Sequence, residues 1–263
     1  MKPSIKILLT AAFISAFSLG GLARAVSANE SHPAVMVQYH SNQMAEASER
    51  NGEANDGKET SGETNERDRE IKDDKVPVSL NDIGKYGENL YDMAKVNDWT
   101  KATANLTSLQ DAARRLRTDL KGGSTQVAQL NTTIATLNKA VAAKDHQAAM
   151  LNSNQVTLIA AKMTAQFEPK VPVEVTLLDY YGRELEIWAA TGNTAKLKTT
   201  AVEMRRTWSA LRPSVQAHRG SAQAQQFDNL LARVEAAKSP AEYGSLATPV
   251  LNAVDNLEKV FTV

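Results

Sequence analysis

Apolar residues recur every three or four positions through most of the chain after residue 76, which is the pattern of amphipathic helices. The longest stripe consists of Trp99, Ala102, Leu106, Leu109, Ala113, Leu116 and Leu120. A shorter stripe precedes it (Ile83, Tyr86, Leu90, Met93), and two more follow (Val127, Leu130, Ile134, Leu137, Val141; then Val156, Ala160, Met163, Phe167). The pattern predicts four helices between Val78 and Phe167 and an all-α fold.

The same order of stripes returns after Pro172. Tyr86-Gly87 matches Tyr181-Gly182 at a shift of 95 residues, and the third and fourth helices match at shifts of 97 and 94. At the first shift the long stripe becomes Leu197, Ala201, Met204, Trp208, Leu211 and Val215. The sequence therefore predicts a tandem duplication of a four-helix unit of the up-down bundle type. Two separate bundles and one eight-helix stack both fit this pattern.

Two prolines, Pro169 and Pro172, separate the two predicted units. We therefore expect the first four-helix unit at 76–170 and the second at 171–263. The junction is only a few residues long, so the units should pack together rather than move independently.

The first 28 residues have the layout of a secretory signal peptide. Two lysines precede an apolar run of 16 residues from Ile7 to Leu22, and small-residue cleavage patterns end at Ala25 and at Ala28. The run is short for a membrane span, although an uncleaved anchor is the alternative. We expect cleavage, most simply after Ala28, and hence a periplasmic or secreted protein with no stable membrane span.

Residues 29–75 should form a disordered acidic tail. Between positions 45 and 75 we count eleven acidic and six basic residues, and Ile71 is the only large apolar side chain. Such a segment buries too little apolar surface to offset the entropy lost on ordering.

Composition excludes several classes of function. The chain has no cysteine, which rules out disulfides, thiolate metal sites and cysteine nucleophiles. Its 30 basic and 30 acidic residues lack the basic excess of a general nucleic-acid binder. No nucleophile elbow, Walker loop or dinucleotide-binding glycine motif is present, so we expect no enzymatic activity and no bound cofactor.

One local pattern resembles a known class. Asn97-Asp98-Trp99-Thr100-Lys101-Ala102 forms a turn leading into a long amphipathic helix, and Gly192-Asn193-Thr194-Ala195-Lys196-Leu197 is its counterpart. This arrangement resembles that of uncharacterised bacterial cell-envelope helical-bundle proteins. The resemblance implies a fold and a compartment for residues 80–263, and no activity.

Two groups of residues could bind a metal. Met36, His40 and Met44 would place two thioethers and an imidazole on one helical face, a donor set that favours Cu(I). The alternative is chance occurrence in a weakly apolar stretch. His146 and Met150 lie four residues apart, and a His–Met pair can ligate haem in a four-helix bundle. Ligands from one helix cannot occupy opposite faces of a haem, so a surface histidine is the simpler interpretation.

The aromatic residues are better explained by packing than by chemistry. Asp179, Tyr180 and Tyr181 could nevertheless line a cleft between the units. The function that fits the sequence best is a non-enzymatic binding or scaffold module in the cell envelope, whose partner is another envelope protein. The alternative is a bundle that handles copper or haem.

Overall fold

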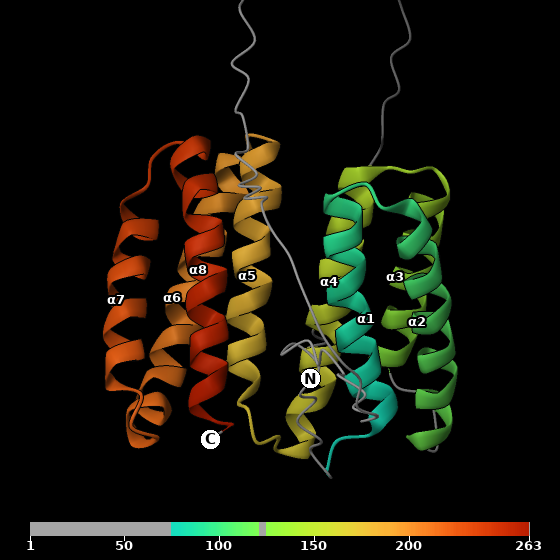
Figure 1. The fold of residues 1–263 in the computed structure, drawn as a ribbon, viewed down its shortest axis with the longest axis horizontal. Coiled ribbons are helices and arrows are strands. Elements are labelled where there is room, and N and C mark those ends of the chain that lie inside the picture. The colour runs from blue at the N-terminus through green and yellow to red at the C-terminus, as the bar shows by residue number, and fades with distance from the viewer. Residues whose placement is uncertain (1–74, 121–124, 263) are drawn as a thin grey trace, which may run out of the picture. The chain divides into compact units, whose positions relative to one another are not determined.

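The computed structural model describes residues 75–120 and 125–262, and these form helices and no strand (Figure 1). All of them belong to one compact unit, Glu63–Val263. The prediction of an all-α fold is confirmed. The helices are α1 (Val78–Lys95), α2 (Trp99–Asp119), α3 (Thr125–Ala142), α4 (His146–Thr164), the short 3-10 helix η2 (Ala165–Phe167), α5 (Val173–Ala190), α6 (Thr194–Ala217), α7 (Ser221–Ala236) and α8 (Pro240–Val260).

Several sequence predictions lie outside the described residues. These are the signal peptide at 1–28, the acidic tail at 29–75 apart from Lys75, and the candidate ligands Met36, His40 and Met44. They stay predictions, as do the unit boundaries at 76–170 and 171–263. None of the described helices is long and apolar enough to cross a membrane.

The eight long helices form two antiparallel four-helix bundles, each with its own apolar core (Figure 1). In the first bundle α1 packs against α2 and α4, and α3 packs against α2 and α4; in the second, α5 to α8 pack in the same pairs. The two bundles meet where α4 packs against α5, and Ile187 of α5 joins the core of the first bundle. Between the two arrangements left open by the sequence, the structure has two bundles.

The turn after the first helix of each bundle has the same construction. Asn97 and Gly192 adopt left-handed backbone angles, with φ of 59° and 67°. The next residue then caps the following helix: Asp98 accepts a hydrogen bond from the Lys101 amide, and Asn193 accepts one from the Lys196 amide, both at 3.1 Å. Such caps satisfy amides that have no partner inside the helix, which explains why α2 and α6 begin where they do.

A glycine allows close contact between the first and fourth helices of each bundle. A Cβ atom on Gly87 would lie 3.2 Å from Val156 Cγ1 of α4, and one on Gly182 would lie 3.4 Å from Val250 Cγ1 of α8. In the sequence, the two glycines match at the shift of 95 residues, and the two valines match at the shift of 94 predicted for the fourth helix.

Candidate binding site between the two bundles

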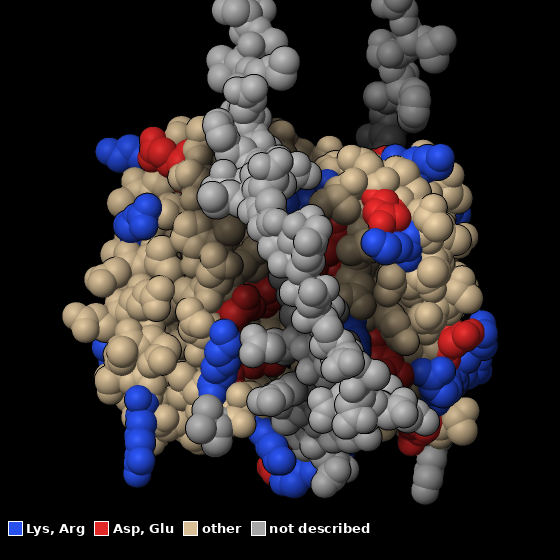
Figure 2. Space-filling model, viewed as in Figure 1, with Lys and Arg blue, Asp and Glu red and all other residues tan. Residues whose placement is uncertain are grey.

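Charged and polar side chains of α1 and α5 meet where the bundles join. We call this cluster the seam: Glu88, Tyr91, Asp92 and Lys95 of α1 with Asp179, Arg183 and Glu186 of α5. Figure 2 shows acidic side chains along the hollow between α5 and α1 on the face drawn. A seam of this composition distinguishes the junction from the apolar cores on either side of it.

Arg183 lies at the centre of the seam and is 8% exposed. Its Nη1 is 2.9 Å from Asp179 Oδ2, one turn earlier on α5, and its Nη2 is 4.0 Å from Glu88 Oε2 on α1. The guanidinium carbon also lies 5.1 Å from the centre of the Tyr91 ring, within range of a cation–π interaction. Arg183 therefore contacts Asp179 within α5 and reaches two side chains of the other bundle, Glu88 and Tyr91.

The seam holds more carboxylates than Arg183 can neutralise. Burial raises the pKa of Asp179 to about 6 against the opposing effect of Arg183, and the nearby charges of Asp255, Asp92 and Glu258 add to the rise. Burial likewise raises the pKa of Glu88 above its usual range. Of these two side chains Asp179 is 17% exposed and Glu88 is 41% exposed. The Asp179 carboxyl is therefore the more buried of the two.

The Arg183 guanidinium itself stays charged. Burial alone would lower its pKa, but the carboxylates of Asp179 and Glu88 outweigh burial and raise it above the usual value. A permanently charged guanidinium suits a buried position of this kind, because it can interact with several carboxylates at once.

A second polar contact crosses the seam beside Arg183. The Tyr91 hydroxyl donates to Glu186 Oε2 at 2.9 Å, and Lys95 Nζ lies 2.8 Å from Glu186 Oε1. Tyr91 is 1% exposed, so its ring packs in the core while its hydroxyl reaches across the junction.

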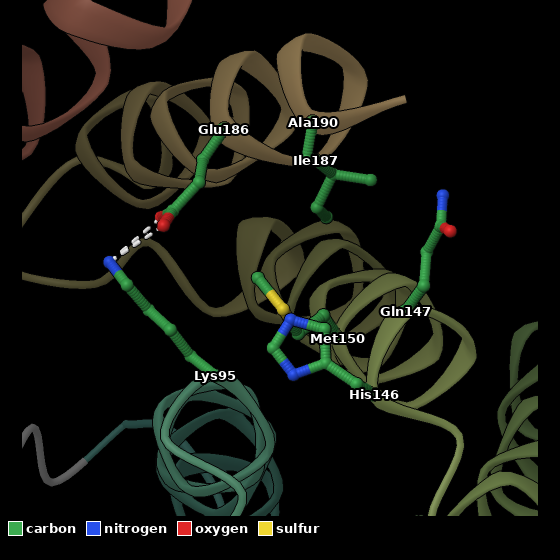
Figure 3. A pocket seen from close by; sticks show the side chains of 7 residues that line it. All are labelled: Lys95, His146, Gln147, Met150, Glu186, Ile187 and Ala190. Carbon is green, nitrogen blue, oxygen red and sulfur yellow. Dashed lines mark hydrogen bonds and ion pairs between the residues drawn. The ribbon is translucent and has the colours of Figure 1, made fainter. Parts of the chain in front are cut away.

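At the end of the seam, where α1 and α5 end and α4 begins, lies a cavity of about 310 Å³. We call it the end pocket. Its lining residues come from both bundles: Lys95, His146, Gln147, Met150, Glu186, Ile187 and Ala190 (Figure 3). Met150, Ile187 and Ala190 provide apolar surface, while the ion pair between Lys95 and Glu186 forms one polar side.

Asp145 fixes the start of α4 at the pocket, because its side chain accepts a hydrogen bond from the Ala148 amide at 3.0 Å. His146 is the first residue of the helix, and its Nδ1 lies 2.9 Å from the carbonyl oxygen of Ala94 on α1. Since a carbonyl oxygen only accepts, Nδ1 donates and the neutral ring has its lone pair on Nε2. Met150, one turn further along α4, is 5% exposed and also lines the pocket.

The structure thus brings the sequence candidates His146 and Met150 to one pocket. Of the other candidates, Asp179 lies in the seam, and Tyr180 is 9% exposed with its carbonyl accepting a hydrogen bond from Asn154 of α4 at 3.0 Å. Among the residues that the structure describes, no group of three or more His, Asp and Glu side chains is arranged to hold a metal ion.

Sequence reasoning missed Arg183, Glu88, Glu186 and Lys95. The repeat predicted from the sequence held a signal that could have found three of them, because the shift of 95 matches Glu88 with Arg183 and Tyr91 with Glu186. Opposite charges or hydrogen-bonding groups at matched positions indicate contact when the two copies face each other.

Comparison of the chain with protein-family models, with curated proteins and with solved structures finds no match. The structure itself defines the class of protein. The described residues form an all-helical protein of two four-helix bundles, with the seam and the end pocket between them.

Proposed function

We propose that this chain is an exported, non-enzymatic binding protein of the cell envelope that holds a small ligand in the end pocket. The observation that carries the proposal is a cavity of about 310 Å³ with walls from both bundles. Sites for small molecules are typically concave, at least roughly 300 Å³ in volume, and placed at the junction of structural units.

The lining of the pocket suggests the kind of ligand. Met150, Ile187 and Ala190 would contact an apolar body, and His146 and Gln147 could bond to a polar group. Lys95 and Glu186 neutralise each other, so the pocket has no strong preference for ligand charge. A small molecule with an apolar body and one or two polar groups fits this arrangement.

Export is supported by the basic, apolar and small-residue segments of residues 1–28. Tandem duplication of a four-helix unit is supported by the matching turns at Asn97 and Gly192 and by the matching glycines Gly87 and Gly182. Under this proposal the single chain contains two copies of one unit, and the ligand binds where they join.

Native mass spectrometry of the full-length protein, purified from the envelope of its own cell without denaturation, tests this function. We expect an adduct of constant mass on the wild type. Ala190→Trp should abolish it, because Ala190 is an exposed residue at the end of α5 and a Trp there would fill the pocket.

Ala236→Trp is the matched control, since Ala236 is an exposed last residue of α7 that does not line the pocket. It should keep the adduct. If the wild type and both variants have the mass of the polypeptide alone, or if the adduct persists in Ala190→Trp, ligand binding at this pocket is contradicted.

A further inference from the structure

One side of the end pocket carries one nitrogen donor, the imidazole of His146, and one sulfur donor, the thioether of Met150. His146 and Met150 are four residues apart on α4, a spacing that places Cβ atoms about 5–6 Å from each other. Both side chains line the pocket. We infer that His146 Nε2 and Met150 Sδ form a binding site for Cu(I). The inference goes beyond the proposed function, because it assigns a metal ion to one side of the same pocket.

The imidazole ring of His146 is held in place by a hydrogen bond to α1. His146 Nδ1 donates to the Ala94 carbonyl at 2.9 Å, which ties the ring to α1 and leaves the Nε2 lone pair free of that contact. Histidine ligands in metal sites commonly donate their second ring N–H to a carbonyl or carboxylate in this way. In Figure 3 the ring points one edge toward α1 and the opposite edge toward Met150.

The thioether is held in place by packing. Met150 belongs to the core of the first bundle and is 5% exposed, yet it reaches the pocket surface. Thioether and imidazole donors together favour a soft ion such as Cu(I) over Zn²⁺, Mg²⁺ or Ca²⁺.

The local electrostatics also suit a cation. The helices α1 and α5 end at the pocket, and helix C-termini carry partial negative charge. The opposing N-terminus of α4 is capped by the Asp145 carboxylate. The ammonium of Lys95 is paired with Glu186 at 2.8 Å, which reduces its repulsion of a bound cation.

The test is a titration of the full-length protein with Cu(I) under anaerobic, reducing conditions, in competition with a chromophoric Cu(I) chelator. We expect one ion bound per chain at this site. His146→Gln and Met150→Leu should each weaken binding at least tenfold, because each removes one of the two donors. The leucine keeps the volume and apolar character of the methionine, so the core should stay packed.

Two matched variants control for residue type. His218→Gln removes an exposed histidine whose Nδ1 is likewise 2.9 Å from a carbonyl, that of Ser214, but which has Ala222 rather than a methionine one turn on. Met163→Leu removes a core methionine of α4 that does not line the pocket. Both should bind Cu(I) as the wild type does.

A triple variant, with Met36 and Met44 changed to Leu and His40 to Gln, removes the other sequence candidate. Binding that persists in this background supports the pocket site, whereas binding that disappears with it overturns the inference. Titration of methyl-labelled methionine with Ag(I), a soft analogue of Cu(I), gives an independent readout on the unaltered pocket. The Met150 methyl signal should shift and the Met163 signal should not.

The two proposals fail separately. No competitive Cu(I) binding by the wild type, or wild-type binding by both His146→Gln and Met150→Leu, overturns the metal site. An organic adduct that is lost only in Ala190→Trp would still support the proposed function in that case. Cu(I) binding without any organic adduct would support the metal site and contradict the proposed function.

Discussion

The Tyr91 hydroxyl donates a hydrogen bond to Glu186 across the junction of the two bundles, and the two residues occupy matched positions 95 residues apart. Glu88 and Arg183, 4.0 Å apart in the same seam, are separated by the same interval. Matched residues contact each other near the axis of a two-fold interface, as in a symmetric dimer. This relationship fits our proposal that the chain is a duplicated unit, in which the copies diverged to complementary side chains at the seam.

Tyr91→Phe should lower the free energy of unfolding by about 1.5–3 kcal/mol, the usual contribution of a hydrogen bond to a charged group. A double-mutant cycle with Glu186→Gln, followed by urea denaturation, isolates the pair from the rest of the seam. The control is another Tyr–Glu hydrogen bond, between Tyr180 and Glu184, which is also 2.9 Å long but lies within α5. Since Tyr180→Phe breaks no contact between the bundles, only the Tyr91 variant should loosen the α1–α5 junction in hydrogen exchange.

Arg183→Met should destabilise the protein at pH 7 by about 3–5 kcal/mol, because it leaves the carboxylates of Asp179 and Glu88 close together without a cation. Adding Asp179→Asn should recover part of the loss, so the two changes should be non-additive in urea denaturation. Arg206→Met is the surface control, as this side chain is 83% exposed and lies 3.9 Å from Glu203. A loss for Arg206→Met as large as that for Arg183→Met would refute the assignment of a special role to Arg183.

The sequence predicted the cores well, because each helix buries one continuous stripe. Leu106, Leu109 and Leu116 of α2 and their counterparts Ala201, Met204 and Leu211 of α6 are all buried as the spacing required. The seam could not be predicted from spacing in the same way. Arg183 falls between the stripe positions Tyr181 and Leu185, where a charged residue normally faces solvent.

The candidate site was predicted only in part for a related reason. His146 and Met150 stood out by residue type and spacing, while Ile187 and Ala190 carry no chemical signal and reach the pocket only through packing between bundles. An α4–α5 contact depends on how two complete bundles dock. Periodicity within a single helix holds no information about that arrangement.

Glycine substitutions on α1 should separate helix propensity from close packing. Gly84→Ala should stabilise the protein by up to about 1 kcal/mol, because a new Cβ would lie 4.0 Å from Ala160 and alanine favours helix. Gly87→Ala should destabilise it, because its Cβ would lie 2.9 Å from Thr157 Oγ1 and 3.3 Å from the Ser153 carbonyl oxygen. Thermal unfolding measures both changes, and equal effects at the two positions would argue against close contact at Gly87.

Asp179 in the seam should make the folded protein less stable as pH rises, which is opposite to the usual effect of a carboxyl group whose pKa is lowered by folding. The pKa of Asp179 is raised to about 6 in the folded protein, so between about pH 4 and 6 the folded state holds a proton that the unfolded state has lost. The stabilisation that this proton provides is fully present below the pKa of the unfolded carboxyl and is lost as pH rises through 6. A two-unit rise corresponds to at most about 3 kcal/mol. Asp179→Asn cannot titrate, so its unfolding free energy should fall less than that of the wild type over this range.

Asp228 of α7 should make stability depend on pH in the opposite direction to Asp179. Arg212 and the Trp208 indole, 2.8 Å and 2.7 Å away, lower the pKa of the Asp228 carboxyl. Its contribution is present above the unfolded pKa and is lost as pH falls through the folded value. Urea denaturation from pH 3 to 8 should therefore show the wild type losing its advantage over Asp228→Asn on acidification. Relative to Asp179→Asn, the wild type should instead lose ground as pH rises. Parallel profiles for the two variants would mean that burial at the seam does not control the protonation of Asp179.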